Sequence, residues 1–480
     1  MKVLFAASEA APYVKTGSLG DVASALPKAL CADPETQVFV FLPYYKSIKE
    51  DPNWNMEFVT SFNVPLGWRN QYCGLIHAVT KGNLHYYFID NEYYFYRDSV
   101  YGYNDDGERF AFFSKAVLES LMHLNWYPNV IHANDWQTAL IPVFLRAFYQ
   151  ELDAYRAIKT LFSIHNVEYQ GKESYYFIQD CLGLPYDWHG AMQFDGCTNF
   201  LKAAINVADH VNTVSRTYAE EIQTPYFSHG LHDVLRHHNY KLSGIVSGID
   251  TEVFDPASDP LIHAVFDSND VNGKKANKAY LQQKLGLICR EDVPLIIIVS
   301  RLVGHKGLDL IQAVMEDLMY EEFQLVVIGI GDHRYEDMFR AYAARAPHRV
   351  SANILFDDAL AHQAFAAADL LLMPSKHEPC GLTQLIAMRY GTVPVVRETG
   401  GLLDTVPAYN PETGEGLGFT FQTYNAHDML DAVRRALALY RDRAQWDKLC
   451  SNVMTNDVSW DRSVEEYREI YRSLLEEPNM

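Results

Sequence analysis

The chain of 480 residues is poor in cysteine and in basic residues. Its 7 cysteines are an odd number, and they are widely spaced without a Cys-x-x-Cys pair. This pattern argues against a disulfide framework and a structural zinc site, and it favours a reducing compartment. Lysine and arginine total 40 against 61 aspartates and glutamates, which gives a formal net charge of −21. Because nucleic acid and anionic lipid both attract basic surfaces, this balance argues against either as a partner.

Long apolar runs are also missing. The longest, such as Leu295–Val299 and Leu370–Met373, have the length of a strand, so we predict no membrane-spanning segment and no membrane partner. The opening residues turn polar at Ser8, which is too early for a signal peptide, and we expect a cytoplasmic protein. Hydrophobic residues make up 48% of the chain and charged residues 21%, as in globular proteins, and the length predicts two or three domains.

Short apolar runs recur along the chain, separated by amphipathic stretches of helical length. Many of these runs are apolar throughout, which is typical of parallel strands that helices bury on both faces. The pattern therefore predicts an α/β protein with doubly wound sheets. The predicted strands cover residues 3–7, 38–42, 85–89, 130–133, 159–164, 210–214, 295–300, 324–328, 353–356, 370–373 and 393–396.

A turn-rich stretch over residues 244–260 interrupts this series, and a new series of strands begins at Leu295. We predict an N-terminal domain over residues 1–245 and a C-terminal domain over residues 246–459. A last helix follows in residues 460–480, with Ser463 and Glu466 as its capping box.

The first candidate site is a loop after the first predicted strand, where Lys15, Gly17 and Ser18 precede an amphipathic stretch. Glycine lets the backbone approach a ligand, and the N-terminus of the following helix offers free N–H groups to an anion. Lys15 adds a movable cation. The spacing differs from that of a P-loop and from the dinucleotide-binding GxGxxG motif, and an ordinary strand–helix turn is the alternative.

Two polar clusters, His132–Trp136 and Ser163–Glu168, end later strands. Ligands of open α/β sheets sit beyond the carboxyl ends of the strands, so Asp135, His165 and Asn166 are candidate site residues. The two histidines lie on different strands and form no HxH or HxxxH pair, so we predict no metal here. The alternative is that these side chains cap neighbouring helices.

The second half of the chain carries a cationic loop and a loop with a conspicuous carboxylate. Arg301 can bind two oxygens of a diphosphate, and Lys306 adds a point charge; a solvated loop with ordinary ion pairs is the alternative. Pro379 and Gly391 should start and end a helix, which places Glu378 just before its N-terminus. Glu378 could then accept hydrogen bonds from sugar hydroxyls, and its alternative role is a helix cap. Free N–H groups near the helix start could hold phosphates, which gives a predicted phosphate-binding loop of Cys380, Gly381, Leu382 and Thr383.

Aromatic residues are plentiful, at 13% of the chain. Tyr93, Tyr94 and Trp136 could stack on sugar rings, because an aromatic face suits an apolar ring surface. The alternative for each of them is packing in the core.

Together these motifs resemble the bacterial glycogen synthases and plant starch synthases of glycosyltransferase family 5. The matching segments follow the family order along nearly the whole chain: residues 15–22, 105–110, 132–138, 163–171, 218–225, 247–254, 300–309, 378–384 and 400–406. The resemblance implies a GT-B fold, in which two Rossmann-like, doubly wound domains face a central cleft and the C-terminal helix crosses back to the first domain. It also implies a retaining hexosyltransferase that uses ADP-glucose as donor and an α-1,4-glucan such as glycogen as acceptor.

The resemblance also implies roles for single residues. By motif, Lys15 and Gly17 approach the donor phosphates, Arg301 and Lys306 clamp the diphosphate, Glu378 binds the glucosyl hydroxyls, and Asp135, His165 and Asn166 line the sugar pocket. Four positions depart from the family: Ser18 stands for a glycine, Ser247 for an asparagine, His305 for a glutamine and Arg216 for a proline. Ser18 adds a side chain where the backbone should approach phosphate, and Ser247 shortens a group of the donor pocket, so we expect effects on rate and donor specificity.

We predict no metal and no cofactor, because cationic side chains can neutralise the leaving diphosphate and the chain contains no Asp-x-Asp motif. One alternative is another retaining GT-B transferase that uses UDP-glucose, such as an enzyme like sucrose synthase. Another is a glucan-binding homologue weakened in catalysis, which Ser18, Ser247 and Arg216 would favour. A glucan phosphorylase would need a pyridoxal phosphate lysine motif that is missing. A nicotinamide dehydrogenase would need a third glycine after Gly329 and Gly331.

Overall fold

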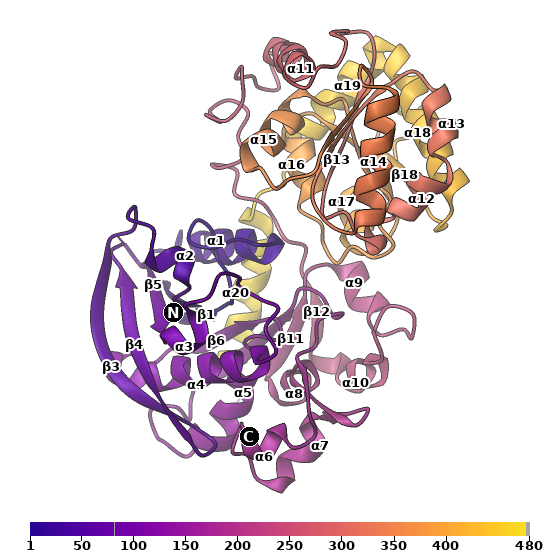
Figure 1. Ribbon diagram of the computed structural model, residues 1–480. Helices are drawn as coiled ribbons and strands as arrows, with labels where there is room; N and C mark the ends of the chain where they lie inside the picture. The colour runs from indigo at the N-terminus through magenta and orange to yellow at the C-terminus, as the bar shows by residue number, and fades with distance from the viewer. Residues whose placement is uncertain (81, 477–480) are drawn as a thin grey trace. The chain divides into compact units, whose positions relative to one another are not determined.

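The computed structural model describes residues 1–80 and 82–476, and these residues form two compact units (Figure 1). The first unit combines Met1–Ser247 with the chain from Trp460, and the second unit is Gly248–Ser459. The first boundary therefore falls two residues after the predicted one. The last four residues of the predicted C-terminal segment, 477–480, lie outside the described residues.

The described residues of the first unit build a nine-stranded sheet in the order β12-β11-β7-β6-β1-β2-β5-β4-β3. Its first seven strands are parallel, and β4 and β3 are antiparallel additions at one edge. The strands are β12 (Leu242–Gly244), β11 (His210–Thr213), β7 (Lys159–Ile164), β6 (Val130–Asn134), β1 (Lys2–Ala6), β2 (Gln37–Pro43), β5 (Leu84–Asp90), β4 (Arg69–Ala78) and β3 (Met56–Leu66). Side chains such as Val3, Val130 and Leu161 are completely buried, which is why these strands are apolar throughout.

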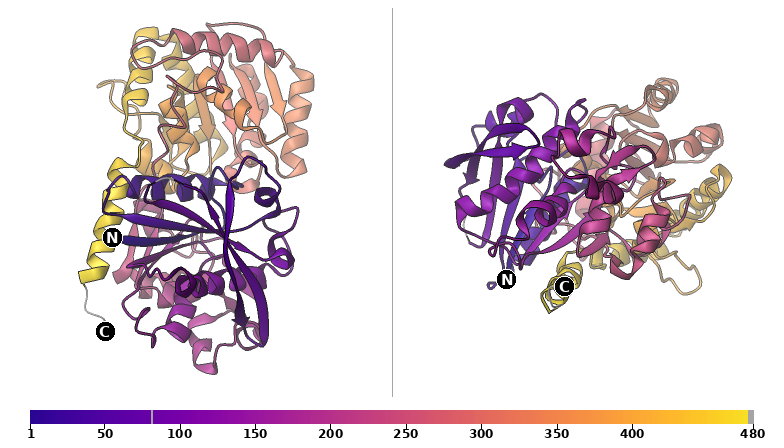
Figure 2. Two further views of the ribbon diagram at one scale, coloured as in Figure 1. Left: turned by 90° about the vertical axis from the view of Figure 1, so that its left-hand side faces the viewer. Right: turned by 90° about the horizontal axis from the view of Figure 1, so that it is seen from below.

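Helices cover both faces of this sheet. In one layer α5 contacts both α4 and α8, and in the other α1 contacts α20, where the yellow α20 lies beside the indigo α1 (Figure 2). The helices are α1 (Ser18–Leu30), α2 (Lys46–Lys49), α3 (Glu92–Phe95), α4 (Asp106–Leu124), α5 (Leu140–Phe144), α6 (Phe177–Asp180), α7 (His189–Met192), α8 (Phe200–Val207), α9 (Arg216–Glu221), α10 (His232–His237) and α20 (Asp461–Glu476).

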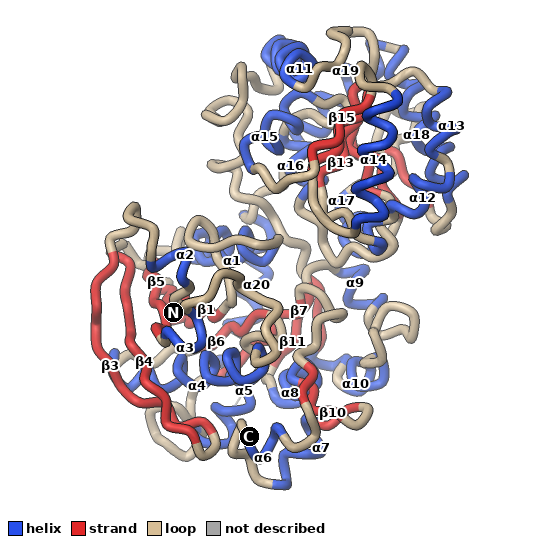
Figure 3. Tube along the Cα trace, viewed as in Figure 1, coloured by secondary structure: helices blue, strands red, loops and turns tan. Residues whose placement is uncertain are grey.

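The hairpin formed by the long strands β3 and β4, drawn at the edge of the sheet in Figure 3, was not predicted. Its outer strand alternates between polar and apolar residues and stays half exposed, so no continuous apolar run marks it. A second, three-stranded sheet of β8 (Lys172–Glu173), β10 (Cys197–Asn199) and β9 (Gln193–Phe194) was also not predicted, because strands this short carry little pattern.

The C-terminal helix α20 belongs to the first unit, and its predicted capping box is wrong. The helix begins at Asp461, so Ser463 lies within its first turn and donates a hydrogen bond to the carbonyl of Val246 at 2.5 Å. Glu466 pairs instead with Arg216 at 3.1 Å.

The second unit contains a parallel six-stranded sheet in the order β15-β14-β13-β16-β17-β18, with helices on both faces (Figure 3). The strands are β15 (Val350–Asn353), β14 (Gln324–Ile328), β13 (Leu295–Val299), β16 (Leu370–Met373), β17 (Val393–Arg397) and β18 (Phe419–Phe421). The helices are α11 (Asn272–Lys284), α12 (Leu308–Ala313), α13 (Met315–Tyr320), α14 (His333–Arg345), α15 (Asp358–Ala367), α16 (Thr383–Arg389), α17 (Gly400–Thr405), α18 (Ala426–Arg441) and α19 (Arg443–Thr455).

One predicted strand of this unit is misplaced. The prediction covered 353–356, whereas β15 ends at Asn353 and the apolar residues that follow lie in a loop, with Phe356 largely exposed. The edge strand is itself only partly buried, so its sequence is more polar than that of the central strands. Within residues 1–80 and 82–476, no helix combines the length and the apolar character needed to cross a membrane.

Candidate functional site

In the first unit, polar side chains gather where the neighbouring strands β1, β6 and β7 end. The loop after β1 is held by Glu9, a buried carboxylate that accepts hydrogen bonds from the backbone N–H of Thr16 at 2.5 Å and from its hydroxyl at 2.8 Å. Burial raises the pKa of Glu9, although the hydrogen bonds from Thr16 and Gly17 oppose the shift. Sequence reasoning missed this carboxylate, although its position directly after the first strand was a usable signal.

The predicted anion loop leads into α1, as expected. Gly17 precedes the helix with φ −158°, an extended conformation that any residue can adopt. A Cβ atom there would lie 3.7 Å from the nearest atom, a side-chain oxygen of Glu9, which is an ordinary contact. The protein's own packing therefore does not require glycine, whereas the close approach of a ligand would. Lys15 forms an ion pair with Asp21 at 2.9 Å, and Ser18 is the exposed first residue of the helix.

Asp135 and His165 lie together beyond β6 and β7. The Oδ1 atom of Asp135 accepts the backbone N–H of His165 at 2.7 Å, and Asp135 has a left-handed backbone with φ 60°. Burial raises the pKa of Asp135 to about 7, against the lowering effect of the N–H groups of His165 and Asn166. Asn166 is half exposed, and its side chain accepts the N–H of Glu168 at 3.0 Å.

The hydrogen bonds around His165 assign its tautomer. Asn134 donates from Nδ2 to the carbonyl of Ala6 at 3.0 Å, so its Oδ1, 2.9 Å from His165 Nε2, must be the acceptor. His165 therefore carries its proton on Nε2, and Nδ1 keeps a lone pair. Burial lowers the pKa of His165 to about 4, so the ring is neutral at neutral pH. It can accept a hydrogen bond from a hydroxyl group but cannot act as a cation.

His132, from the same motif as Asp135, is a core residue. Its ring contacts the Tyr471 hydroxyl at 2.8 Å and the Ser163 hydroxyl at 2.5 Å, and Ser163 donates in turn to Asn212. Asn212 donates to the Tyr467 hydroxyl at 3.0 Å. This buried chain of hydrogen bonds ties α20 to β6, β7 and β11.

The three aromatic residues predicted to stack on sugars have different surroundings. Tyr94 is completely buried and donates to Glu108 at 2.6 Å, so its ring packs in the core and cannot stack on a sugar. Trp136 is half buried and packs edge-on against Phe110 with ring centroids 5.2 Å apart. Tyr93 alone is largely exposed, at 68%.

In the second unit, the cationic loop follows β13. Arg301 is exposed directly after the strand, and a short turn over Gly304–Lys306 leads to Gly307, whose φ is 76°. A side chain at Gly307 would strike the carbonyl of Pro374 at 1.9 Å, so the loop lies tightly against the loop after β16. The Lys306 ammonium there reaches the Glu378 carboxylate at 2.6 Å. The structure thus brings together two residues that lie 72 positions apart.

Glu378 is buried but stays ionised. Burial alone would raise its pKa, but the ion pair with Lys306 and the hydrogen bond from the Ser375 hydroxyl, at 2.9 Å, outweigh burial and lower the pKa of Glu378. Ser375 was not among the predicted residues. A carboxylate that keeps its charge in a partly dry site is a strong hydrogen-bond acceptor.

The helix after Glu378 begins later than predicted. Its first residue is Thr383, so Pro379 lies in the preceding loop and does not start the helix. The loop is shaped by contacts from the β17–α17 connection, where the N–H of Gly401 donates to the carbonyl of Glu378 at 3.1 Å. Within the predicted phosphate-binding loop, Cys380 and Leu382 are buried, Gly381 has φ 73°, and Thr383 is half exposed.

Two of the positions that depart from the family, His305 and Ser247, are largely shielded from solvent. His305 precedes Lys306, and burial together with the neighbouring charges of Lys306 and Arg301 lowers the pKa of His305 to about 4, so this ring is neutral. Ser247 is buried at the end of the first unit, and its hydroxyl lacks a hydrogen-bond partner among the residues that the structure describes. In residues 1–80 and 82–476, no three His, Cys, Asp or Glu side chains are grouped so that they could hold a metal ion.

Comparisons with known proteins agree with this architecture. Residues 2–237 match the starch synthase catalytic domain family, and residues 286–449 match glycosyl transferases group 1. The glycogen synthase of Alkaliphilus metalliredigens is 47% identical over 99% of this chain and 100% of its own length. The glycogen synthase of Clostridium botulinum strain Eklund 17B is 48% identical over 99% of both chains.

A solved structure with the same fold is the catalytic domain of starch synthase IV from Arabidopsis thaliana, bound to ADP and acarbose. It has a TM-score of 0.93 and 34% identity, and the match covers 99% of both chains. A sucrose-phosphate synthase from Thermosynechococcus elongatus, with a TM-score of 0.61 and 16% identity, shares the fold.

The two α/β units with parallel sheets and the matched families define a glycosyltransferase of the GT-B fold. The two glycogen synthases match 99% of this chain at 47% and 48% identity, and this similarity identifies the family within that class of enzymes. The chain belongs to the family of glycogen and starch synthases, and it is a hexosyltransferase.

Proposed function

We propose that this enzyme transfers glucose from ADP-glucose to the non-reducing end of an α-1,4-glucan, with retention at the anomeric carbon. The observation that carries the proposal is the contact of Lys306 with Glu378 at 2.6 Å, on loops that follow the adjacent strands β13 and β16. The cation suits the diphosphate of a nucleotide sugar, and the neighbouring ionised carboxylate suits the hydroxyl groups of its sugar. The ADP and acarbose of the Arabidopsis structure and the names of the relatives support this donor and this acceptor.

In this mechanism the C1–O bond to the diphosphate breaks while a bond from C1 to the acceptor 4-hydroxyl oxygen forms on the same face. The proton of that hydroxyl passes to the leaving phosphate oxygen. Arg301 and Lys306 oppose the charge that develops on the diphosphate, and this electrostatic stabilisation is the largest contribution to the rate. Because a neutralised diphosphate leaves readily, the reaction needs no general acid of the glycosidase kind.

Glu378 would hold the glucosyl group by accepting hydrogen bonds from its hydroxyls. Its pKa is lowered, so the carboxylate is available as an acceptor throughout the neutral range. In the first unit, the neutral ring of His165 and the carboxylate of Asp135 are suited to sugar hydroxyls. The N–H group of Ser18 is suited to an anion, because it lies at the start of the long helix α1, whereas the N–H group of Gly17 already donates to Glu9.

The test is transfer of labelled glucose from ADP-glucose to glycogen, with UDP-glucose in a parallel reaction and EDTA in both. We expect transfer from ADP-glucose that EDTA does not reduce, because side-chain cations take the place of a metal ion. A preference for UDP-glucose would overturn the proposed donor, and loss of activity in EDTA would overturn the metal-free clamp. Absence of transfer from both donors, with glycogen still bound, would favour a glucan-binding homologue weakened in catalysis.

A further inference from the structure

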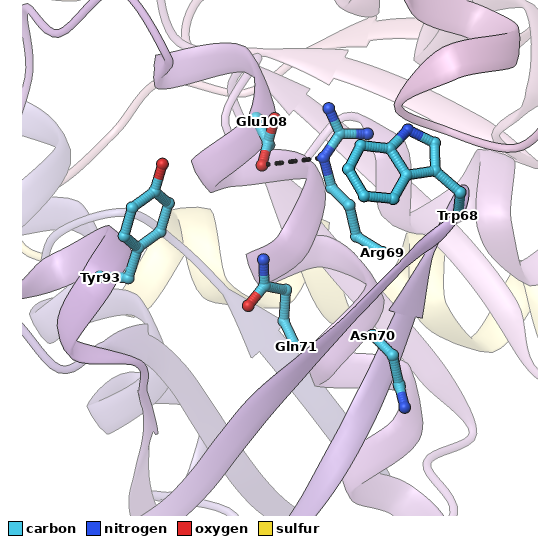
Figure 4. A pocket seen from close by; sticks show the side chains of 6 residues that line it. All are labelled: Trp68, Arg69, Asn70, Gln71, Tyr93 and Glu108. Carbon is cyan, nitrogen blue, oxygen red and sulfur yellow. Dashed lines mark ion pairs between the residues drawn. The ribbon is translucent and has the colours of Figure 1, made fainter.

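A surface hollow lies outside these clusters, at the edge of the first unit's sheet that β3 and β4 form (Figure 4). We call it the Trp68 groove and define it by the residues that line it: Trp68, Arg69, Asn70, Gln71, Tyr93 and Glu108. Tyr93 and Trp68 stand on opposite sides, Arg69 and Glu108 lie between them, and Asn70 points away (Figure 4). Trp68 is 77% exposed and Tyr93 is 68% exposed, so two large aromatic rings are offered to solvent in one place.

The Trp68 wall of the groove is held by several contacts. Trp68 lies in the two-residue turn between β3 and β4, after Gly67, whose φ is 55°. A side chain at Gly67 would meet the carbonyl of Asp180 at 2.5 Å, so the turn is packed against its neighbour. The Trp68 indole N–H donates to the Asp180 carboxylate at 3.2 Å, and the Arg69 guanidinium lies 4.6 Å from the indole ring centre. An exposed ring that is already held, as that of Trp68 is, loses little entropy when a ligand binds.

The polar floor is fixed as well. Arg69 forms an ion pair with Glu108 at 3.2 Å, drawn as a dashed line in Figure 4, and it also donates to the Asp180 carbonyl at 3.1 Å. Glu108 accepts a further hydrogen bond from the buried Tyr94. The charges in the groove are therefore matched within the protein, which suits a neutral ligand with many hydroxyl groups better than a phosphate.

The shape of the groove indicates an elongated ligand. A second hollow shares Gln71 and Tyr93 with the first and continues past Tyr72 and Asn91. The two acidic residues that line this continuation, Asp90 and Glu92, both pair with Lys49. The whole path thus offers aromatic surface, the amide group of Gln71 and neutralised charges to a chain that runs along it.

The sheet topology places the groove near the carboxyl ends of the parallel strands, which is also where the loop after β1 lies. Gly74 of β4 lies opposite Asp90, the last residue of β5, so the stretch from Arg69 to Cys73 projects beyond the carboxyl end of β5. Strands β2 and β5 separate β4 from β1. The distance across the sheet from β1 to β4 is therefore three strand spacings, or roughly 14 Å.

We infer that the Trp68 groove binds the α-glucan acceptor as an anchoring site for the chain. This inference rests on the proposed function for the identity of the glucan. Sugar rings would stack on Trp68 and Tyr93, and hydroxyl groups would bind Gln71, Arg69 and Glu108. A glucan held here keeps its ends at high local concentration, so long acceptors gain more from the groove than short ones.

The test compares wild type with Trp68→Ala and Trp68→Tyr in calorimetric titration with maltoheptaose, without any donor. The matched control is Tyr320→Ala, since Tyr320 is 88% exposed at the end of α13 in the other unit. We expect the Kd to rise about tenfold in Trp68→Ala, to recover in Trp68→Tyr, and to stay unchanged in Tyr320→Ala. An unchanged Kd in Trp68→Ala, or an equal rise in Tyr320→Ala, would overturn the inference.

Kinetics distinguish an anchoring site from a part of the active site. In Trp68→Ala the KM for glycogen should rise about tenfold, and the KM for maltose should rise much less, because maltose is too short to span the distance. An equal rise for both acceptors would overturn the anchoring role. The titration uses no nucleotide sugar, so failure of the proposed transfer from ADP-glucose would leave this test valid.

Discussion

Replacement of Lys306 by methionine separates its role in stability from its role in catalysis. The Lys306 side chain is 18% exposed and that of Glu378 is 7% exposed, and their charged atoms are 2.6 Å apart. Removal of one partner of a buried ion pair costs about 3–5 kcal/mol, and the residual exposure of Lys306 reduces this to about 2–4 kcal/mol. For a domain of this size, that loss lowers Tm by about 5–15 °C.

The loss should depend on pH with a defined sign. In wild type the pKa of Glu378 is lowered, so its contribution to stability is present above its ordinary pKa of 4.5 and is lost as the pH falls. Without Lys306, burial dominates and the folded-state pKa rises above 4.5. The destabilisation of Lys306→Met is therefore largest at pH 7 to 8 and shrinks toward pH 5, which thermal unfolding across this range can measure.

The double variant Lys306→Met with Glu378→Gln removes the stranded charge, so we expect it to recover most of the lost Tm. Its kcat should stay as low as that of Lys306→Met, at least about 10²-fold below wild type, because the transition-state cation is still missing. The matched control is Lys278→Met. Lys278 pairs with Asp369 at 2.7 Å. Asp369 lies at the amino end of β16, whereas Glu378 follows the carboxyl end of the same strand. This control should lose stability but keep its kcat.

A loss of kcat below tenfold in Lys306→Met would refute the electrostatic role of Lys306. An unchanged Tm in that variant, or no recovery in the double variant, would refute the conclusion that the ion pair keeps Glu378 ionised in its buried position.

Three further predictions concern the first unit and the loops. Gly17→Ala should raise the KM for ADP-glucose at least about tenfold with Tm nearly unchanged. Gly307→Ala should lower Tm, because its Cβ would lie 1.9 Å from a carbonyl oxygen. Equal Tm values for the two variants would contradict this prediction. His165 has a pKa of about 4 when folded and about 6.5 when unfolded, so its share of stability is complete above pH 6.5 and falls by about 1.4 kcal/mol per pH unit toward pH 4. Urea unfolding of wild type and His165→Gln should show a flatter pH dependence in the variant. Tyr471→Phe leaves a buried nitrogen of His132 without its partner and should cost about 1–3 kcal/mol in the same assay, so a loss below about 0.3 kcal/mol would contradict the hydrogen-bonded chain.

The parallel strands could be predicted from the sequence because burial on both faces requires a continuous apolar run. The strands over Lys159–Ile164, Gln324–Ile328 and Leu370–Met373 have the predicted bounds. The same rule failed for β3 and β4, because a hairpin with one face in water alternates and leaves no such run. It also misplaced β15, where the apolar residues belong to an exposed loop.

The order of polar loops along the chain was readable from the sequence, since loops that follow parallel strands lie on one edge of the sheet. The sequence alone therefore determined the fold class, the family resemblance and the segments that carry polar chemistry. Tertiary structure decided which of their side chains meet. Tyr93 and Tyr94 are identical neighbours, yet one is 68% exposed and the other is completely buried, because α3 turns only one of them toward the core. Glu378 keeps its charge because the chain folds Lys306 against it and because the nearby Ser375 donates to it. The contact with Lys306 joins residues 72 positions apart, and such a long-range contact leaves no local pattern in the sequence.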